Sequence, residues 1–141
     1  MKPRSYDISD VDELAALLRS CWAKETSDTP SAWTGKNPAF GQCAVTALIV
    51  QDVFGGSLVR CLARIPGTTN RSSHFANILP NGRRVDLTRQ QFPTGTKFGP
   101  GEERTRQYVL QYPKTMYRYG VLLQNLAQHL AWEKFRIANM A

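Results

Sequence analysis

Residues 43–54 read CAVTALIVQDVF, and this stretch decides the fold. It is apolar on almost every side, and Gly55-Gly56 directly after it supply a C-terminal stop for a helix. A helix that is apolar all round is normally buried. The stretch therefore predicts a central helix that begins at Cys43 and is covered by other elements.

Three strand patterns follow this helix. Residues 57–65, SLVRCLARI, alternate in polarity, and residues 74–79 and 83–88 flank the turn sequence Pro80-Asn81-Gly82. The last two strands should form a hairpin. The central helix is thus expected to pack on a small antiparallel sheet.

Two further helices are predicted at the ends of the chain. Ser9 or Asp10 followed by Glu13 is typical of a helix start, and apolar residues at helical spacing extend this helix over about 10–25. Pro113 opens a second helix over about 113–139, with a stripe that continues to Trp132 and Phe135. Segments 26–42 and 89–112 contain many Gly and Pro residues and are expected to be loops.

The bulk composition fits one domain. A chain of 141 residues with 42% apolar content can bury one continuous core, so we expect a single α+β domain over 1–141. Its core should span 10–93, with a C-terminal helical extension over about 113–139. No stretch approaches the ~20 apolar residues of a membrane helix, and the N-terminus lacks a signal-type apolar region. We therefore expect no membrane association and a cytoplasmic location.

The cysteines and charges limit the choice of ligands. Cys21, Cys43 and Cys61 show no CxxC spacing, so neither a metal nor another cofactor is expected, and free thiols fit better than disulfides. The net charge of +7 comes from scattered Arg and Lys residues. It suggests an acidic protein or a nucleic acid as a partner, although no nucleic-acid-binding motif is present.

Cys43 is the candidate nucleophile. The N–H groups at a helix start and the positive end of the helix dipole favour a thiolate, which is the reactive form. A free Cys at such a position is, however, more often a core residue. The case for catalysis therefore depends on which other side chains the sheet brings to it.

The hairpin turn determines whether His74 and Asp86 share a face. A two-residue turn at Asn81-Gly82 would place Asn77 opposite Asp86 and turn His74 to the other face. A type I turn with Gly82 in a left-handed conformation and a bulge makes His74 and Asp86 diagonal neighbours on one face. The second register also gathers apolar residues on the opposite face, and we predict it on that ground.

The chemistry of a thiol enzyme follows from this register. His74 would take the thiol proton and return it to a leaving group, while Asp86 would fix the tautomer of the imidazole. A surface His74, and an Asp86 that only pairs with Arg89 or ends a strand, are the structural alternatives. The backbone N–H of Cys43 and the amide of Gln42 are candidate oxyanion donors, and a hydrogen bond in the loop is the alternative role for Gln42.

Three more polar or aromatic residues complete the candidate site. Asn77 is a candidate supporting residue and needs a partner, because the predicted register places it among apolar residues. Candidate substrate-binding residues are Trp33, Phe75 and Arg89.

Two separated stretches carry a family resemblance. WTGKNPAFGQCAVTALIVQDVFGG and SSHFANILPNGRRVDLTRQQFP resemble the YunG-like bacterial family over roughly residues 17–93. More broadly, a Cys at a helix start, a His in a strand and an Asp in the next strand resemble the papain-like and transglutaminase-like cysteine enzymes. This resemblance implies an α+β fold and thioester chemistry on amide bonds. The helix beyond residue 110 lies outside it.

Three functions remain open at this stage. The leading hypothesis is a thiol-dependent hydrolase or acyltransferase that acts on an amide, thioester or isopeptide-like bond of a protein or peptide substrate. The alternative is a binding module that engages an acidic protein or nucleic acid through a basic face or the C-terminal helix. The third is a structural role with a homodimer formed through the stripe of the C-terminal helix: Leu122, Leu126, Leu130 and Trp132.

Overall fold

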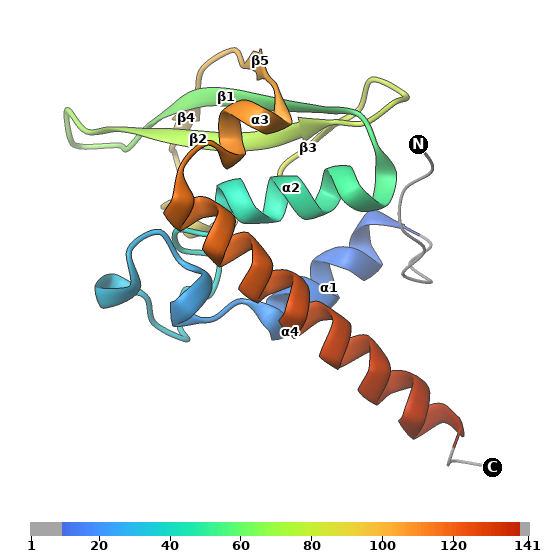
Figure 1. The fold of residues 1–141 in the computed structure, drawn as a ribbon. Helices are drawn as coiled ribbons and strands as arrows, with labels where there is room; N and C mark the ends of the chain where they lie inside the picture. Colours follow the sequence, from blue (N-terminus) through green and yellow to red (C-terminus); the bar gives the residue numbers. More distant parts are fainter. Residues whose placement is uncertain (1–9, 139–141) are drawn as a thin grey trace.

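The computed structural model describes residues 10–138, with side chains described as far as residue 131. It is an α+β structure in three layers (Figure 1). A curled antiparallel sheet forms the first layer, α2 (Cys43–Phe54) packs beneath it, and α1 (Val11–Cys21) and α4 (Pro113–Ala138) lie on the far side of α2. The α+β prediction with a Cys-bearing helix under a sheet is confirmed.

The sheet is built around one long hairpin. β1 (Ser57–Arg64) pairs with β2 (Arg71–Ile78) along its whole length, and β3 (Arg84–Val85) continues the sheet beyond β2. On the other side, β1 pairs with both β4 (Lys97–Phe98) and β5 (Glu102–Arg104). The strand order is therefore β3-β2-β1-β4, with β5 also on β1.

The helix predictions hold at the start of each helix, but α1 ends at Cys21, short of the expected residue 25. Asp10 caps α1 by accepting a hydrogen bond from the Glu13 N–H at 2.7 Å. α2 begins at Cys43 and ends where Gly55 takes a φ of 78°, a conformation that a side chain would disfavour. The predicted contacts of Trp132 and Phe135 lie outside the described side chains.

Two predictions about the second half of the chain were wrong in detail. The strand expected over 83–88 is only β3, because the Asp86 carboxylate accepts the Thr88 N–H at 3.3 Å and turns the chain away. The segment expected to be a loop holds β4, β5 and the short helix α3 (Arg106–Leu110). Single-turn helices also occur at Lys24–Thr26, Pro30–Ala32 and Arg89–Gln91.

The core joins both ends of the chain. Leu14 and Leu18 of α1 pack in one cluster with Ile49 of α2 and with Leu122 and Leu126 of α4, and all five are fully buried. Leu122 and Leu126 are therefore covered within the same chain rather than exposed to a second copy. No helix among residues 10–138 is long and apolar enough to cross a membrane.

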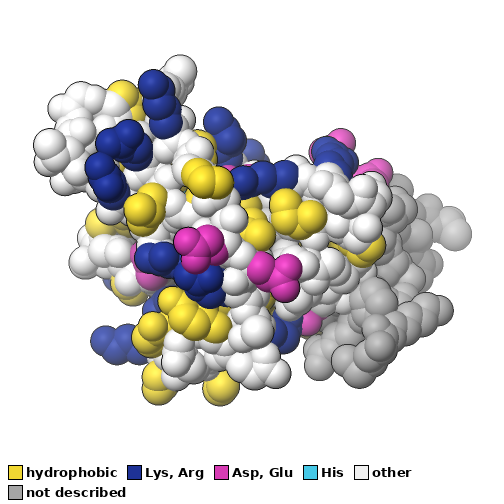
Figure 2. Space-filling model, turned by 90° about the horizontal axis from the view of Figure 1, so that it is seen from above, with side chains coloured by type: hydrophobic (Ala, Val, Ile, Leu, Met, Phe, Trp, Pro, Cys, Tyr) yellow, Lys and Arg dark blue, Asp and Glu magenta, His cyan; other side chains and the backbone are white. Residues whose placement is uncertain are grey.

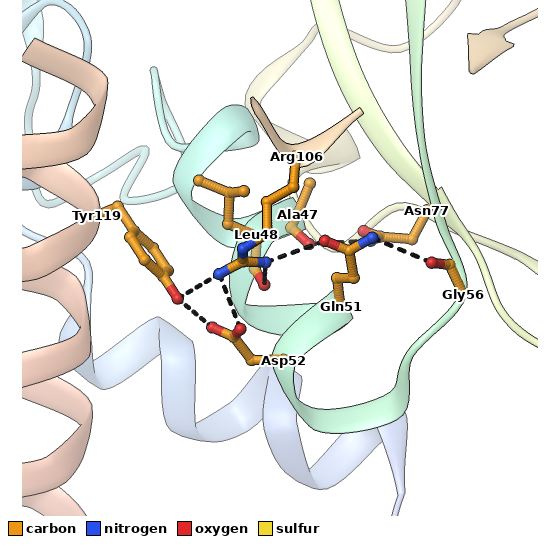
Figure 3. Close-up of polar contacts among 8 residues, drawn as sticks. All are labelled: Ala47, Leu48, Gln51, Asp52, Gly56, Asn77, Arg106 and Tyr119. Carbon is orange, nitrogen blue, oxygen red and sulfur yellow. Dashed lines mark hydrogen bonds and ion pairs between the residues drawn. The ribbon is translucent and has the colours of Figure 1, made fainter. Parts of the chain in front are cut away.

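A polar cluster fixes α2 against α3 and α4 (Figure 3). The Arg106 guanidinium donates to the Asp52 carboxylate at 2.8 Å, to Gln51 Oε1 at 3.0 Å and to the Leu48 carbonyl at 3.3 Å. The Tyr119 hydroxyl, on α4, accepts from Arg106 at 2.6 Å and donates to Asp52. Two elements distant in sequence from α2, namely α3 and α4, are thereby held to its C-terminal half.

Candidate active site

Cys43 occupies the first turn of α2 and is nearly buried, with 8% of its surface exposed. The chain reaches it through Gly41, whose φ is 72°. A Cβ at Gly41 would lie 2.3 Å from Ser27 Oγ and 2.9 Å from the Asp28 backbone nitrogen, so only glycine fits there. The Cys43 thiol is thus presented by a tight turn at the start of a helix, where backbone N–H groups have no partner within the helix.

The hairpin formed by β2 and β3 has the register predicted for a type I turn with a bulge at Gly82. The Leu79 N–H donates to the Arg83 carbonyl at 2.9 Å, the Gly82 N–H donates to the Leu79 carbonyl at 2.8 Å, and Gly82 has a φ of 86°. Asn77 accordingly pairs with Val85 and Ile78 with Arg84. The prediction of this register is confirmed, and the two-residue turn is excluded.

This register brings His74 and Asp86 into direct contact. His74 Nε2 lies 2.7 Å from Asp86 Oδ2, the imidazole is fully buried, and the carboxylate side chain is 13% exposed. The other carboxylate oxygen of Asp86 accepts the Thr88 N–H, so both oxygens are held in place. The geometry orients the ring and leaves its Nδ1 directed away from the carboxylate.

The pKa of His74 is raised from 6.5 to about 9. Burial by itself lowers this pKa, but the hydrogen bond to Asp86, interactions with Cys43 and the charges of both partners together outweigh burial. The imidazole is therefore protonated at neutral pH. A buried cation is stable here because the Asp86 carboxylate pairs with it at 2.7 Å.

Cys43 lies beside the same imidazole. The Nδ1 atom of His74 is buried, and no described residue meets the distance and angle of a hydrogen bond to it. Cys43 is nevertheless among the groups that raise the pKa of the ring. The thiol is thus close to His74 without the alignment of a formed hydrogen bond. Cys43 and Asp86 thus both act on the same imidazole, and a catalytic role for the three residues stays a prediction.

The other two thiols are buried and have raised pKa values. Burial raises the pKa of Cys21 to about 11. The pKa of Cys61 is also raised, mainly by burial, although Arg84 acts in the opposite direction. Both thiols are therefore held in the protonated, unreactive form at neutral pH.

Two phenylalanines enclose the imidazole, and sequence reasoning missed both. The ring centroids of Phe92 and Phe98 lie 5.0 Å and 5.3 Å from that of His74. Arg89, a predicted substrate-binding residue, lies over Phe98 with its guanidinium carbon 4.3 Å from the ring centroid. These aromatic rings exclude water from one side of the histidine.

Gln91, also missed, connects the two halves of the site. Its Oε1 accepts the Gly41 N–H at 3.1 Å, two residues before Cys43, and its backbone carbonyl accepts from Asn37 at 3.1 Å. Its amide nitrogen donates to the Thr88 carbonyl at 3.1 Å. The loop before Cys43 and the segment after Asp86 are therefore held together. The sequence did not indicate this role, because Gln91 is a polar residue in a segment that was predicted to be a loop.

The predicted supporting residues have structural contacts. The Gln42 amide donates to the Ala23 carbonyl at 3.0 Å, while its Oε1 is buried with no hydrogen-bond partner among the described residues. Asn77 lies on the strand face opposite His74, and its amide donates to the Ala47 carbonyl of α2 at 2.9 Å (Figure 3). The buried amide of Asn77 therefore has a hydrogen-bond partner, and this bond connects the sheet to α2.

The predicted aromatic substrate contacts are also engaged elsewhere. Trp33 donates its indole N–H to the Pro38 carbonyl at 3.0 Å and is half-buried in the loop. Phe75 packs on the core cluster that contains Leu48 and Leu58, on the face opposite His74. Of the three predicted substrate-binding residues, the structure brings only Arg89 to the neighbourhood of His74 and Asp86.

No group of three His, Cys, Asp or Glu side chains in the described part of the chain is arranged to hold a metal ion.

Comparisons with known proteins give a family. The family model described as "YunG protein" matches residues 10–131. This match extends beyond residues 17–93, the range expected from the two motifs, at both ends. It includes much of α4. "Uncharacterized protein YunG" of Bacillus subtilis (strain 168) is 35% identical over 82 residues, which are 58% of this chain and 63% of that protein. The match thus spans less than two thirds of the relative. No solved structure is significantly similar to the chain.

Proposed function

The chain belongs to the YunG family, and we propose that it is a thiol-dependent hydrolase or acyltransferase with Cys43 as nucleophile, His74 as acid and base, and Asp86 as the group that orients His74. The observation that carries the proposal is the 2.7 Å contact between His74 and Asp86 on an imidazole that also interacts with the Cys43 thiol. The substrate is an amide, thioester or isopeptide-like bond of a protein or peptide. The arrangement supports a papain-like or transglutaminase-like fold.

The proposed reaction has two halves. In the first, the Cys43 thiolate attacks the carbonyl carbon, and protonated His74 gives its proton to the leaving nitrogen or sulfur as that bond breaks. A thioester on Cys43 and a neutral imidazole result. In the second, His74 takes a proton from water or from an acceptor amine, which attacks the thioester and releases the Cys43 thiolate.

Several features of the site fit this chemistry. The raised pKa of His74 supplies a proton donor at neutral pH, and its contact with Asp86 stabilises the imidazolium. The backbone N–H groups in the first turn of α2, which have no acceptor within the helix, are the candidate oxyanion donors. Gln42 uses its amide in the loop instead, which leaves the first-turn N–H groups as the better oxyanion donors.

Alkylation with iodoacetamide tests the proposal. At pH 7, mass spectrometry should show labelling of Cys43 at least tenfold faster than that of Cys21 or Cys61, because burial raises the pKa of the latter two. His74→Gln should slow the labelling of Cys43, whereas His129→Gln should leave it unchanged. Equal labelling of the three thiols in the folded protein, or a Cys43 rate that His74→Gln does not alter, would refute the proposal.

A basic binding face is the second candidate function. Arg60, Arg64 and Arg71 lie on the same face of the β1–β2 hairpin, together with Leu62, which is exposed. On the side of the sheet away from α2, seen from above in Figure 2, Lys and Arg side chains also outnumber Asp and Glu. A salt-sensitive association with nucleic acid or an acidic protein that survives Cys43→Ala and is lost in a triple Arg→Gln variant of this face would favour it.

A further inference from the structure

A cleft lies beside the His74–Asp86 pair, between the two edges of the curled sheet. Its volume is about 770 Å³. One wall comes from β3 and the residues after it, and the other comes from β4 and the residue before it. The lining residues are Arg84, Asp86, Arg89, Thr96, Lys97 and Phe98.

The lining of this cleft has an excess of positive charge. Three cations, Arg84, Arg89 and Lys97, face a single carboxylate, that of Asp86. Asp86 is already engaged by His74 and by the Thr88 N–H, and none of the three cations forms an ion pair with a described carboxylate. A concave surface lined by one sign of charge concentrates its field and attracts the opposite charge.

An aromatic ring positions one of these cations. Arg89 is stacked on Phe98 at 4.3 Å, and Phe98 in turn lies 5.3 Å from the His74 ring. Stacking holds the planar guanidinium in one orientation and leaves its N–H groups available for a carboxylate or phosphate. A second cavity of about 460 Å³ shares Arg89, Thr96 and Phe98 with the first and extends the groove along residues 89–98.

We propose that this cleft binds an anionic group of the substrate, a carboxylate or a phosphate, next to the bond that Cys43 attacks. The inference rests on the proposed function and names its substrate class: peptides or acyl groups that carry a negative charge close to the scissile bond. Arg84, Arg89 and Lys97 are the residues that determine this specificity.

Two alkylating reagents that differ only in charge test the specificity. Iodoacetate carries a carboxylate, and iodoacetamide is its neutral analogue. In the wild-type protein the ratio of the iodoacetate rate to the iodoacetamide rate at Cys43 should exceed the ratio for free cysteine. Each of Arg84→Gln, Arg89→Gln and Lys97→Gln should lower it by roughly two- to fivefold, as removal of a nearby charge predicts.

The control removes the same charge elsewhere. Arg19 is exposed in the last turn of α1, and Arg19→Gln should leave the ratio unchanged. Added salt should reduce the ratio in the wild type toward that of the cleft variants. Lys97→Gln is the most informative variant if Arg89→Gln disturbs folding, because Lys97 is exposed and has no ring contact with Phe98.

A binding measurement separates this inference from the proposed function. Glutarate and phenyl phosphate are titrated separately into the protein, and amide NMR shifts of residues 84–98 are followed; the reagent that binds more tightly identifies carboxylate or phosphate. Shifts that Lys97→Gln weakens, together with the rate ratio, support the inference. A reactive Cys43 without charge preference or anion binding overturns the inference alone. Anion binding with a Cys43 inert to both reagents overturns the proposed function and, with it, the assignment of the anion to a substrate.

Discussion

Replacing Asp86 with Asn should abolish the raised pKa of His74. The substitution keeps the size of the side chain and removes the negative charge that lies 2.7 Å from Nε2. Burial of the imidazole then dominates and lowers its pKa, because a fully buried ring loses the hydration of its charged form. In the variant His74 should be neutral at pH 7, whereas in the wild type it is protonated.

The expected effect on stability follows from the two pKa values of His74. The folded value of about 9 lies above the ordinary value of 6.5. At ~1.36 kcal/mol per pH unit, this difference stabilises the folded wild type by about 3 kcal/mol. Since the folded pKa is the higher one, the stabilisation is fully present below pH 6.5 and is lost as the pH rises to about 9.

Chemical denaturation at several pH values measures this effect. The free energy of unfolding of the wild type should fall by about 3 kcal/mol between pH 6 and pH 9, and this fall should be absent in Asp86→Asn. Measurements should stop at pH 9, because above it the buried Cys21 thiol, with a pKa of about 11, adds its own pH dependence. Imidazole NMR signals give the pKa of His74 directly, since the chain has only two histidines.

The matched control is Glu103→Gln, which removes one exposed negative charge from β5. It should leave both the pKa of His74 and the pH dependence unchanged. A wild-type pKa near 6.5, or the same pKa in Asp86→Asn and wild type, would show that the carboxylate does not stabilise the imidazolium.

Three further predictions concern the scaffold of the site. Gly56→Ala should destabilise the fold by at least about 2 kcal/mol more than Gly82→Ala. Both glycines have a φ of 86°. A Cβ at Gly56 would lie 2.1 Å from a carbonyl oxygen of the neighbouring strand, whereas a Cβ at Gly82 would have no such neighbour within 4 Å. Equal losses of unfolding free energy in urea for the two variants would show that Gly56 does not lie this close to the neighbouring strand. Leu126→Ala, in the core, should cost about 2–5 kcal/mol, whereas Met116→Ala, which is exposed, should cost less than about 0.5 kcal/mol. Similar midpoints for these two variants would place α4 outside the core. Gln91→Ala should slow iodoacetamide labelling of Cys43 by removing the hydrogen bonds that join the two halves of the site, and an unaltered rate would show that they do not position the thiol.

The parts of the fold that sequence reasoning predicted are those with strong local signals. The helix from Cys43 was predicted because an apolar stretch ends at a pair of glycines. The His74–Asp86 contact was predicted because Pro80-Asn81-Gly82 specifies a turn, and the turn specifies the register. In both cases the determining residues are neighbours in the chain.

Contacts set by tertiary pairing were not predictable in the same way. β4 and β5 are two and three residues long, so their alternation is too short to read, and both exist because β1 offers them an edge. The positions of Phe92 and Phe98 over His74 depend on that pairing. Likewise, nothing in the sequence near Arg106 shows that it contacts Asp52 and Tyr119 on two other helices.

The hairpin also determines the order in which the reactive groups assemble during folding. His74 and Asp86 are only 12 residues apart, and a hairpin of this size forms in about 1–10 μs. Cys43 lies about thirty residues earlier and reaches the imidazole only when α2 has docked on the sheet, which is a slower, non-local event. A nascent chain therefore exposes Cys43 first, and this thiol has neither base nor oxyanion donors until the domain is complete. Under the proposed function, the protein acquires its reactivity only with its native fold, so that unfolded or half-made chains do not acylate themselves.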